Sequence, residues 1–212
     1  MDQGTQTVQK LVVIGASAGG IDALTQVLSA LPADLPAPIL VVQHLRPDRE
    51  TRLPEHLARH SPLQVCLAQH GMLLESGVVY VAAPGQHLRV GNGHLILELA
   101  EPVHYVCPAA DVLFASAAQA FGPHVVGIIL SGTGRDGARG CQDIQAKGGV
   151  TIAQDAKTSR YFAMPKAAID AEAIDYVLSL PEIAGKIMAL VRQRRQEGSR
   201  RLTEENRKGA HR

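Results

Sequence analysis

The stretch LVVIGASAGGIDAL, residues 11–24, decides the fold of this chain. Its first six residues are apolar or small, as in a buried strand, and they run directly into a glycine-rich turn. A helical pattern follows, with apolar residues recurring on one face at Ile21, Leu24, Leu28 and Leu31. Strand, turn and helix in direct succession predict the opening of an α/β sheet. Ser17 lies in the middle of the turn, which either cradles a phosphate or presents a nucleophile.

The rest of the chain repeats this alternation. Continuous runs rich in Val and Ile, typical of parallel strands buried on both faces, occupy residues 38–43, 77–83, 125–131 and 149–154. Helical patterns lie at 21–31, 109–121, 137–149 and 181–196. We therefore expect an α/β fold with a doubly wound, mostly parallel, Rossmann-like sheet. Residues 87–99 break the pattern with two short strands around Gly91-Asn92-Gly93, which predicts an added antiparallel hairpin.

Length and composition fit one intracellular domain. A chain of 212 residues that is 46% apolar can bury a core without disulfides or metal. It has no apolar run of about eighteen residues, so we expect no membrane insertion. Residues 1–10 do not resemble a signal peptide, and the three cysteines form no C-x-x-C pair, which fits a cytoplasmic setting. We expect an N-terminal tail at 1–10, one folded domain at 11–191 and a basic tail or linker at 192–212.

Charge is unevenly distributed along the chain. Residues 192–212 hold eight Lys and Arg against three Glu, so thirteen of the 21 basic residues and seventeen of the 20 acidic ones precede them. A basic tail can bind nucleic acid or an acidic partner, but it is more often solvated or a linker. Aromatic residues make up only 3% of the chain, too few for stacking bases, so we expect no nucleic-acid partner.

The turn at Ser17 fits a nucleophile better than a phosphate. The Walker pattern is absent because no lysine follows Gly20, and Ser17 stands where a dinucleotide fingerprint has its second glycine. The helix N-terminus still offers N–H groups to an anion. Residues 15–19 satisfy G-x-S-x-G, whose glycines allow a sharp turn that lifts the serine hydroxyl clear of the sheet. As an isolated match, the motif is better explained by structure, because small residues recur at strand–helix turns for packing and Ser17 could be the helix N-cap.

Two other loops strengthen the nucleophile hypothesis. His44 follows strand 38–43 and Asp136 follows strand 125–131, so both lie at the carboxyl edge where open parallel sheets place their sites. A histidine takes the proton of a serine, and a carboxylate fixes the tautomer of that histidine. The chain order Ser…His…Asp differs from that of α/β-hydrolases, but a triad is defined by geometry.

Five segments carry a family resemblance: IGASAGG, VVQHLRPD, VYVAAPGQHL, ILSGTGRDGARG and AQDAKTSRYFAMPKAAI. Over residues 9–190, in this order, they resemble the catalytic domain of chemotaxis protein-glutamate methylesterases, the CheB family. The resemblance implies a doubly wound sheet with a hairpin, with Ser17 as nucleophile, His44 as base and Asp136 as orienting acid. It also implies an oxyanion hole formed by the backbone N–H groups of Ala18 and Thr133.

The chain departs from the family pattern at several positions. Ala18 replaces the usual threonine and Thr133 the usual methionine, and both changes are tolerable if these residues act through the backbone. PAAD at 108–111 replaces PSVD, which removes a serine hydroxyl. The ten residues before Leu11 hold no receiver domain, so we expect activity that a phosphodonor does not raise.

The expected function is hydrolysis of γ-glutamyl methyl esters on methyl-accepting chemoreceptors, with methanol released through an acyl-enzyme and no cofactor or metal. The family also deamidates receptor glutamines. A signalling domain, fused or separate, is a further expected partner. The alternative is a scaffold or anion-binding module of the same fold with an idle triad.

Five other residues fit a structural explanation at least as well as a functional one. His56 and His60 have the i, i+4 spacing of a metal pair, but no third ligand is nearby in sequence. Cys141 reads as a packed small residue. His87 and Met164 lie in family motifs and are candidates for lining the site, although a structural hydrogen bond and a helix start also explain them.

Overall fold

The computed structural model describes residues 8–45 and 51–193, so most of the predicted N-terminal tail and of the basic tail lies outside the described residues. Seven parallel strands form one sheet in the order β3-β4-β2-β1-β7-β8-β9. Their bounds are Leu11–Ala16 (β1), Ile39–Gln43 (β2), Gln64–Leu67 (β3), Val78–Val81 (β4), Val125–Ile129 (β7), Val150–Gln154 (β8) and Tyr176–Leu178 (β9). The predicted doubly wound sheet is confirmed.

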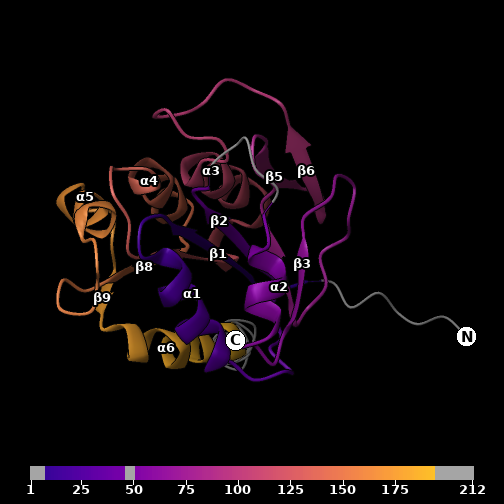
Figure 1. Ribbon diagram of the computed structural model, residues 1–212, viewed down its shortest axis with the longest axis horizontal. Coiled ribbons are helices and arrows are strands. Elements are labelled where there is room, and N and C mark those ends of the chain that lie inside the picture. Colours follow the sequence, from indigo (N-terminus) through magenta and orange to yellow (C-terminus); the bar gives the residue numbers. More distant parts are fainter. Residues whose placement is uncertain (1–7, 46–50, 194–212) are drawn as a thin grey trace, which may run out of the picture.

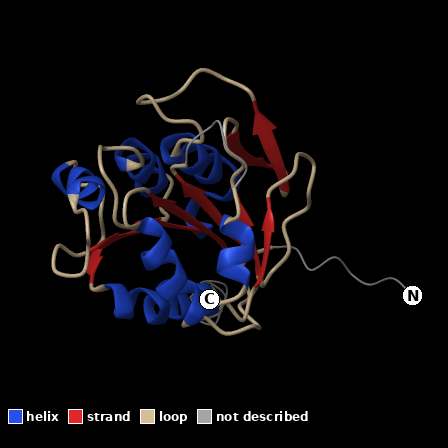
Figure 2. Ribbon diagram, in the orientation of Figure 1, coloured by secondary structure: helices blue, strands red, loops and turns tan. Residues whose placement is uncertain are grey.

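Helices cover both faces of this sheet (Figures 1 and 2). One face carries α1 (Gly20–Ser29), α2 (Leu53–Ala58) and α6 (Leu180–Arg192). The other carries α3 (Ala110–Phe121), α4 (Ala138–Ala146) and α5 (Ala163–Asp170). A 3₁₀ turn, Gly122–His124, links α3 to β7. No helix among the described residues is long and apolar enough to cross a membrane.

The central strand shows why the apolar runs are continuous. In β1, Val12 and Ile14 belong to the core beneath α1 and α6, whereas Leu11 and Val13 belong to the core beneath α3. Successive side chains of a strand point to opposite faces, so a strand between two helical layers must be apolar at every position. Burial on both faces therefore fixes β1 at the centre of the domain.

The predicted hairpin is confirmed, but it forms a two-stranded sheet of its own rather than joining the seven strands. Strands β5 (His87–Gly91) and β6 (His94–Glu98) pair antiparallel around Asn92 and Gly93, which both have positive φ. β5 lies against α3, where the N–H of Val90 donates to Ser116 Oγ at 3.1 Å. The hairpin buries its apolar face on α3 and so needs no place at the sheet edge.

The strand order places the site. β1 pairs with β2 on one side and with β7 on the other, both in parallel. The loops that follow β1, β2 and β7 therefore leave the same edge of the sheet, next to one another, at its topological switch point. These three loops carry Ser17, His44 and Asp136.

Candidate active site

The turn after β1 is shaped by glycine and held from the β7 side. Gly19 has a φ of +72°, and the N–H of Ser17 donates to the carbonyl of Ser131 at 3.0 Å. The N-cap of α1 is Gly19, and no side chain caps this helix. The N-cap explanation for Ser17 is therefore wrong, and its hydroxyl makes no hydrogen bond within the described residues.

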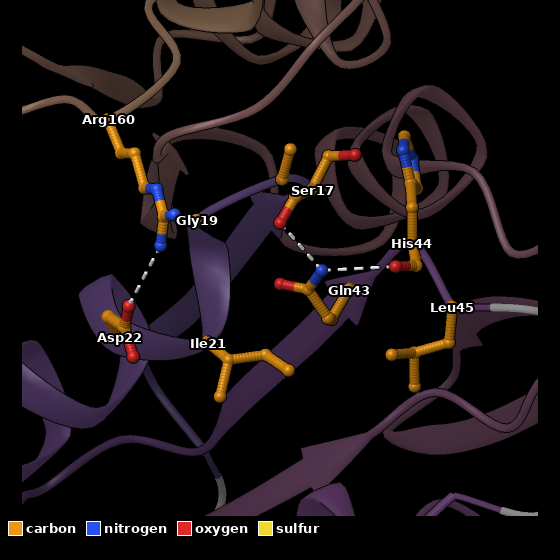
Figure 3. A pocket seen from close by; sticks show the side chains of 9 residues that line it. Ser17, Gly19, Ile21, Asp22, Gln43, His44, Leu45 and Arg160 are labelled. Carbon is orange, nitrogen blue, oxygen red and sulfur yellow. Dashed lines mark hydrogen bonds and ion pairs between the residues drawn. The ribbon is translucent and has the colours of Figure 1, made fainter.

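Ser17 and His44 line one open cleft of about 550 Å³ at the carboxyl edge of the sheet. The Ser17 hydroxyl points toward the imidazole ring of His44 (Figure 3). Both side chains belong to the residues that the structure describes, and no hydrogen bond joins them. Hydrogen bonds between catalytic groups are often long in a free enzyme and shorten when substrate binds.

Asp136 fixes the histidine. Its Oδ2 lies 2.7 Å from Nε2 of His44, and the aspartate is only 2% exposed. An ionised carboxylate only accepts hydrogen bonds, so neutral His44 carries its proton on Nε2. Nδ1 is then the ring nitrogen with a lone pair available as a base. The structure thus brings together all three residues that the sequence predicted for the triad.

The charge of Asp136 is stabilised by the N-terminus of α3. The backbone N–H of Ala110 donates to Oδ2 at 2.6 Å, and that of Asp111 donates to Oδ1 at 3.0 Å. Burial by itself raises the pKa of Asp136, but the hydrogen bonds from His44 and from these two N–H groups outweigh it. The pKa therefore lies below its ordinary value.

A second buried carboxylate, Asp111, lies beside the first. It accepts a hydrogen bond from the N–H of Gly140, near the start of α4, at 2.7 Å. Its other oxygen lies 3.3 Å from Nε2 of His104. Burial and the nearby charge of Asp136 raise the pKa of Asp111 in spite of these contacts. The pKa values of the two neighbouring carboxylates are thus shifted in opposite directions.

The two predicted oxyanion-hole residues present unused backbone donors. Neither the N–H of Ala18 nor that of Thr133 donates to an acceptor among the described residues. Ala18 lies in the cleft directly after Ser17, and Thr133 is exposed on the loop after β7. Two such N–H groups are the donors that an oxyanion of a tetrahedral intermediate requires.

His87 and Met164 do not line the cleft. His87 is buried, and its Nδ1 accepts from the N–H of Ala109 at 3.2 Å while Nε2 lies 3.0 Å from the carbonyl of Glu101. Met164 is fully buried, and Gly132 separates it from Ser17. His87 thus holds the residue that precedes α3, and Met164 packs against Gly132.

No group of three or more His, Cys, Asp or Glu residues in the described part of the chain is placed to hold a metal. The rings of His56 and His60 lie 5.1 Å apart, and Nε2 of His56 lies 3.3 Å from Oγ1 of Thr25. Cys141 is fully buried, and burial raises the pKa of its thiol. A buried neutral thiol is a packing residue and a poor nucleophile.

Three residues of the site were missed by the sequence analysis: Gln43, Ser131 and Arg160. The hydroxyl of Ser131 donates to the carbonyl of Ala18 at 2.8 Å and so holds the Ser17 turn. Arg160 lines the cleft and lies 4.0 Å from Asp22. Gln43 could have been noticed, because it is a polar residue that ends a buried apolar strand.

Comparisons with known proteins agree with this architecture. Residues 12–187 match the family model for CheB methylesterase. A protein-glutamate methylesterase/protein-glutamine glutaminase of Anaeromyxobacter dehalogenans is 45% identical over 86% of this chain and 54% of its own length. Protein-glutamate methylesterase FrzG of Myxococcus xanthus is 41% identical over 85% of this chain and 54% of its own length.

The same agreement holds in three dimensions. The crystal structure of the Thermotoga maritima CheB methylesterase catalytic domain superposes with a TM-score of 0.82 and 36% identity. The match covers 85% of this chain and 98% of that domain. The chain spans about half the length of the two relatives named above. By family model, sequence identity and fold, this chain belongs to the CheB methylesterase family.

Proposed function

We propose that this chain is a serine esterase that hydrolyses γ-glutamyl methyl esters on chemoreceptors. The observation that carries the proposal is the bond of 2.7 Å between His44 Nε2 and Asp136 Oδ2, in a cleft where the Ser17 hydroxyl faces the same histidine. The names of the relatives support the substrate class, because they are protein-glutamate methylesterases and protein-glutamine glutaminases.

In the proposed acylation step, Ser17 Oγ attacks the ester carbonyl carbon while Nδ1 of His44 takes the hydroxyl proton. The carboxylate of Asp136 stabilises the imidazolium that forms, and the N–H groups of Ala18 and Thr133 bind the oxyanion. The intermediate collapses when the methoxy group leaves with the proton from His44, as methanol. A γ-glutamyl ester of Ser17 remains.

In the second step, water attacks this acyl-enzyme and gives its proton to His44. His44 returns this proton to Ser17 as the glutamate side chain leaves as a carboxylic acid, which then loses its own proton to solvent as it becomes a carboxylate. A receptor glutamine would follow the same path, with ammonia in place of methanol as the leaving group. No step needs a metal or a cofactor.

The test measures methanol release from methylated receptor membranes by the wild-type chain and by Ser17→Ala. We expect the variant to lose at least about 1,000-fold in kcat, because no other group can form the acyl-enzyme. A fluorophosphonate probe should label the wild-type chain and not the variant. A folded Ser17→Ala chain that releases methanol at the wild-type rate would contradict the proposal.

A further inference from the structure

Gln43 connects the two loops that carry the candidate nucleophile and base. It is the last residue of β2 and is only 3% exposed. Its Nε2 donates to the main-chain carbonyl of Ser17 at 2.8 Å and to that of His44 at 3.1 Å (Figure 3). One amide nitrogen therefore binds the backbone of both residues.

The orientation of this amide follows from its partners. Carbonyl oxygens only accept hydrogen bonds, so the NH₂ group must face Ser17 and His44, and Oε1 must point away. Oε1 is buried and has no hydrogen-bond partner among the described residues. It lies against Gly20, where a Cβ would come within 2.4 Å of it. An unpaired buried acceptor lowers stability, so the fold tolerates a cost at this position.

The regular sheet does not connect Ser17 to His44. The register of β1 and β2 ends at the pair Ala16 and Gln43, followed by one bond from the N–H of His44 to the carbonyl of Ala16. The N–H of Ser17 bonds to Ser131, on the side of β7. Beyond the end of the ladder, the amide of Gln43 is the described group that ties the Ser17 and His44 carbonyls to each other.

We infer that Gln43 is a positioning residue that holds Ser17 and His44 at their working separation. This inference rests on the proposed esterase function and extends it. Gln43 lines the cleft, but its side chain is buried and both hydrogen bonds of its Nε2 go to backbone carbonyls. Its loss should therefore slow the chemical step and leave substrate binding almost unchanged.

The test is Gln43→Met, which keeps nearly the same volume and removes both N–H donors. With a methylated receptor or a small neutral ester, we expect kcat to fall about 10- to 100-fold and KM to stay within about twofold. Labelling with a fluorophosphonate should reach the wild-type stoichiometry, but more slowly. Full stoichiometry would show that every molecule is folded. A lower kcat would then come from misplaced catalytic groups and not from an unfolded fraction.

Thr151→Val is the matched control. Thr151 is fully buried in β8 and donates from Oγ1 to Asp175 at 3.0 Å, outside the cleft. Removal of the Thr151 hydroxyl should lower the free energy of unfolding and leave kcat unchanged. A second readout combines Gln43→Met with His44→Ala. If Gln43 acts by placing the base, its removal should cost much less in that background than in the wild type.

Each result has one meaning. An unchanged kcat in folded Gln43→Met, a change confined to KM, or an equal loss in the His44→Ala background would overturn the inference. Partial labelling with normal kcat per labelled site would also overturn it, because Gln43 would then support folding only. A wild-type chain that neither labels nor hydrolyses esters would instead refute the proposed function.

Discussion

Asp136 caps the N-terminus of α3, the helix that carries Asp111, and Asp111 in turn binds the start of α4, the helix that follows Asp136. Asp136, just before α4, accepts from the N-terminal N–H groups of α3, and Asp111, in the first turn of α3, accepts from the N–H of Gly140 in α4. Neither helix has a cap from its own N-cap side chain. The candidate orienting acid is thus part of the helix packing, and its position is set by the fold.

Asp136→Asn should lower kcat for ester hydrolysis by about 10³- to 10⁴-fold. The N–H groups of Ala110 and Asp111 bind different oxygens of the carboxylate, so an amide, with its one oxygen, leaves one of them without an acceptor. Where the NH₂ group takes the Oδ2 position, Nε2 of His44 accepts from it, the imidazole proton moves to Nδ1, and His44 has no lone pair for Ser17. Where the amide oxygen takes that position, the side chain still carries no charge to stabilise the imidazolium. Steady-state kinetics with a small ester measure this loss. Asp170→Asn, on the exposed face of α5, is the control and should keep wild-type kinetics. Full activity in folded Asp136→Asn would show that another residue orients His44.

The same substitution should reveal a pH-dependent contribution to stability. The pKa of Asp136 in the folded chain lies below the ordinary 3.8, so its charged form stabilises the fold above that value, and this contribution is lost as the pH falls through the lower folded pKa. The free energy of unfolding of the wild type should exceed that of Asp136→Asn by more at pH 6 than at pH 3. Urea denaturation at both pH values tests this. A difference that is constant or grows toward low pH would contradict the lowered pKa.

Asp111→Asn should show the opposite slope. The pKa of Asp111 is raised above 3.8, so burial of its charge costs stability that is absent at low pH and appears as the pH rises through the folded pKa. An asparagine oxygen can still accept from Gly140 and carries no charge. Relative to the wild type, the variant should therefore gain stability between pH 3 and pH 7. Urea titrations in which the variant loses stability relative to the wild type over this range would refute the raised pKa.

The strands that the sequence predicted and those it missed differ in burial. β1, β2, β4, β7 and β8 appear as continuous Val and Ile runs because helices cover both of their faces. The edge strands β3 and β9 were missed because they are short and partly exposed, which leaves no apolar run. Pairing with the neighbouring strand makes them strands, and that information lies elsewhere in the chain.

The features of the site also divide into those that the sequence predicted and those that it could not. Ser17, His44 and Asp136 could be predicted because each directly follows a recognisable strand or motif, and the order of parallel strands places their loops together. The crossed capping of Asp111 and Asp136 could not, because it depends on how the ends of two helices approach each other. The two carbonyl contacts of Gln43 were likewise invisible, since backbone acceptors have no signature in a sequence.

Chelation tests the absence of a metal requirement. We expect EDTA to leave the rate of ester hydrolysis unchanged, because the proposed mechanism needs only Ser17, His44, Asp136 and backbone N–H groups. The measurement compares methanol release before and after dialysis against the chelator. A loss of activity that zinc restores would direct attention to His56 and His60, whose rings lie 5.1 Å apart.

Gly132→Ala should impair both packing and catalysis because Gly132 has no space for a side chain. A Cβ there would lie 2.4 Å from the sulfur of Met164 and 2.9 Å from Cβ of Ser17. Met164 is fully buried and cannot withdraw into solvent, so the strain should move the Ser17 turn. We expect a loss of about 1–3 kcal/mol in the free energy of unfolding and a fall in kcat.

Gly185→Ala is the matched control for this substitution. Gly185 lies in α6, and a Cβ there would meet no atom within 4 Å. Alanine favours a helix over glycine by about 1 kcal/mol, so this variant should be at least as stable as the wild type, with unchanged kcat. Thermal unfolding and ester kinetics on both variants make the comparison. If Gly132→Ala behaved like Gly185→Ala, the close packing of Met164, Gly132 and Ser17 would not be what holds the nucleophile turn in place.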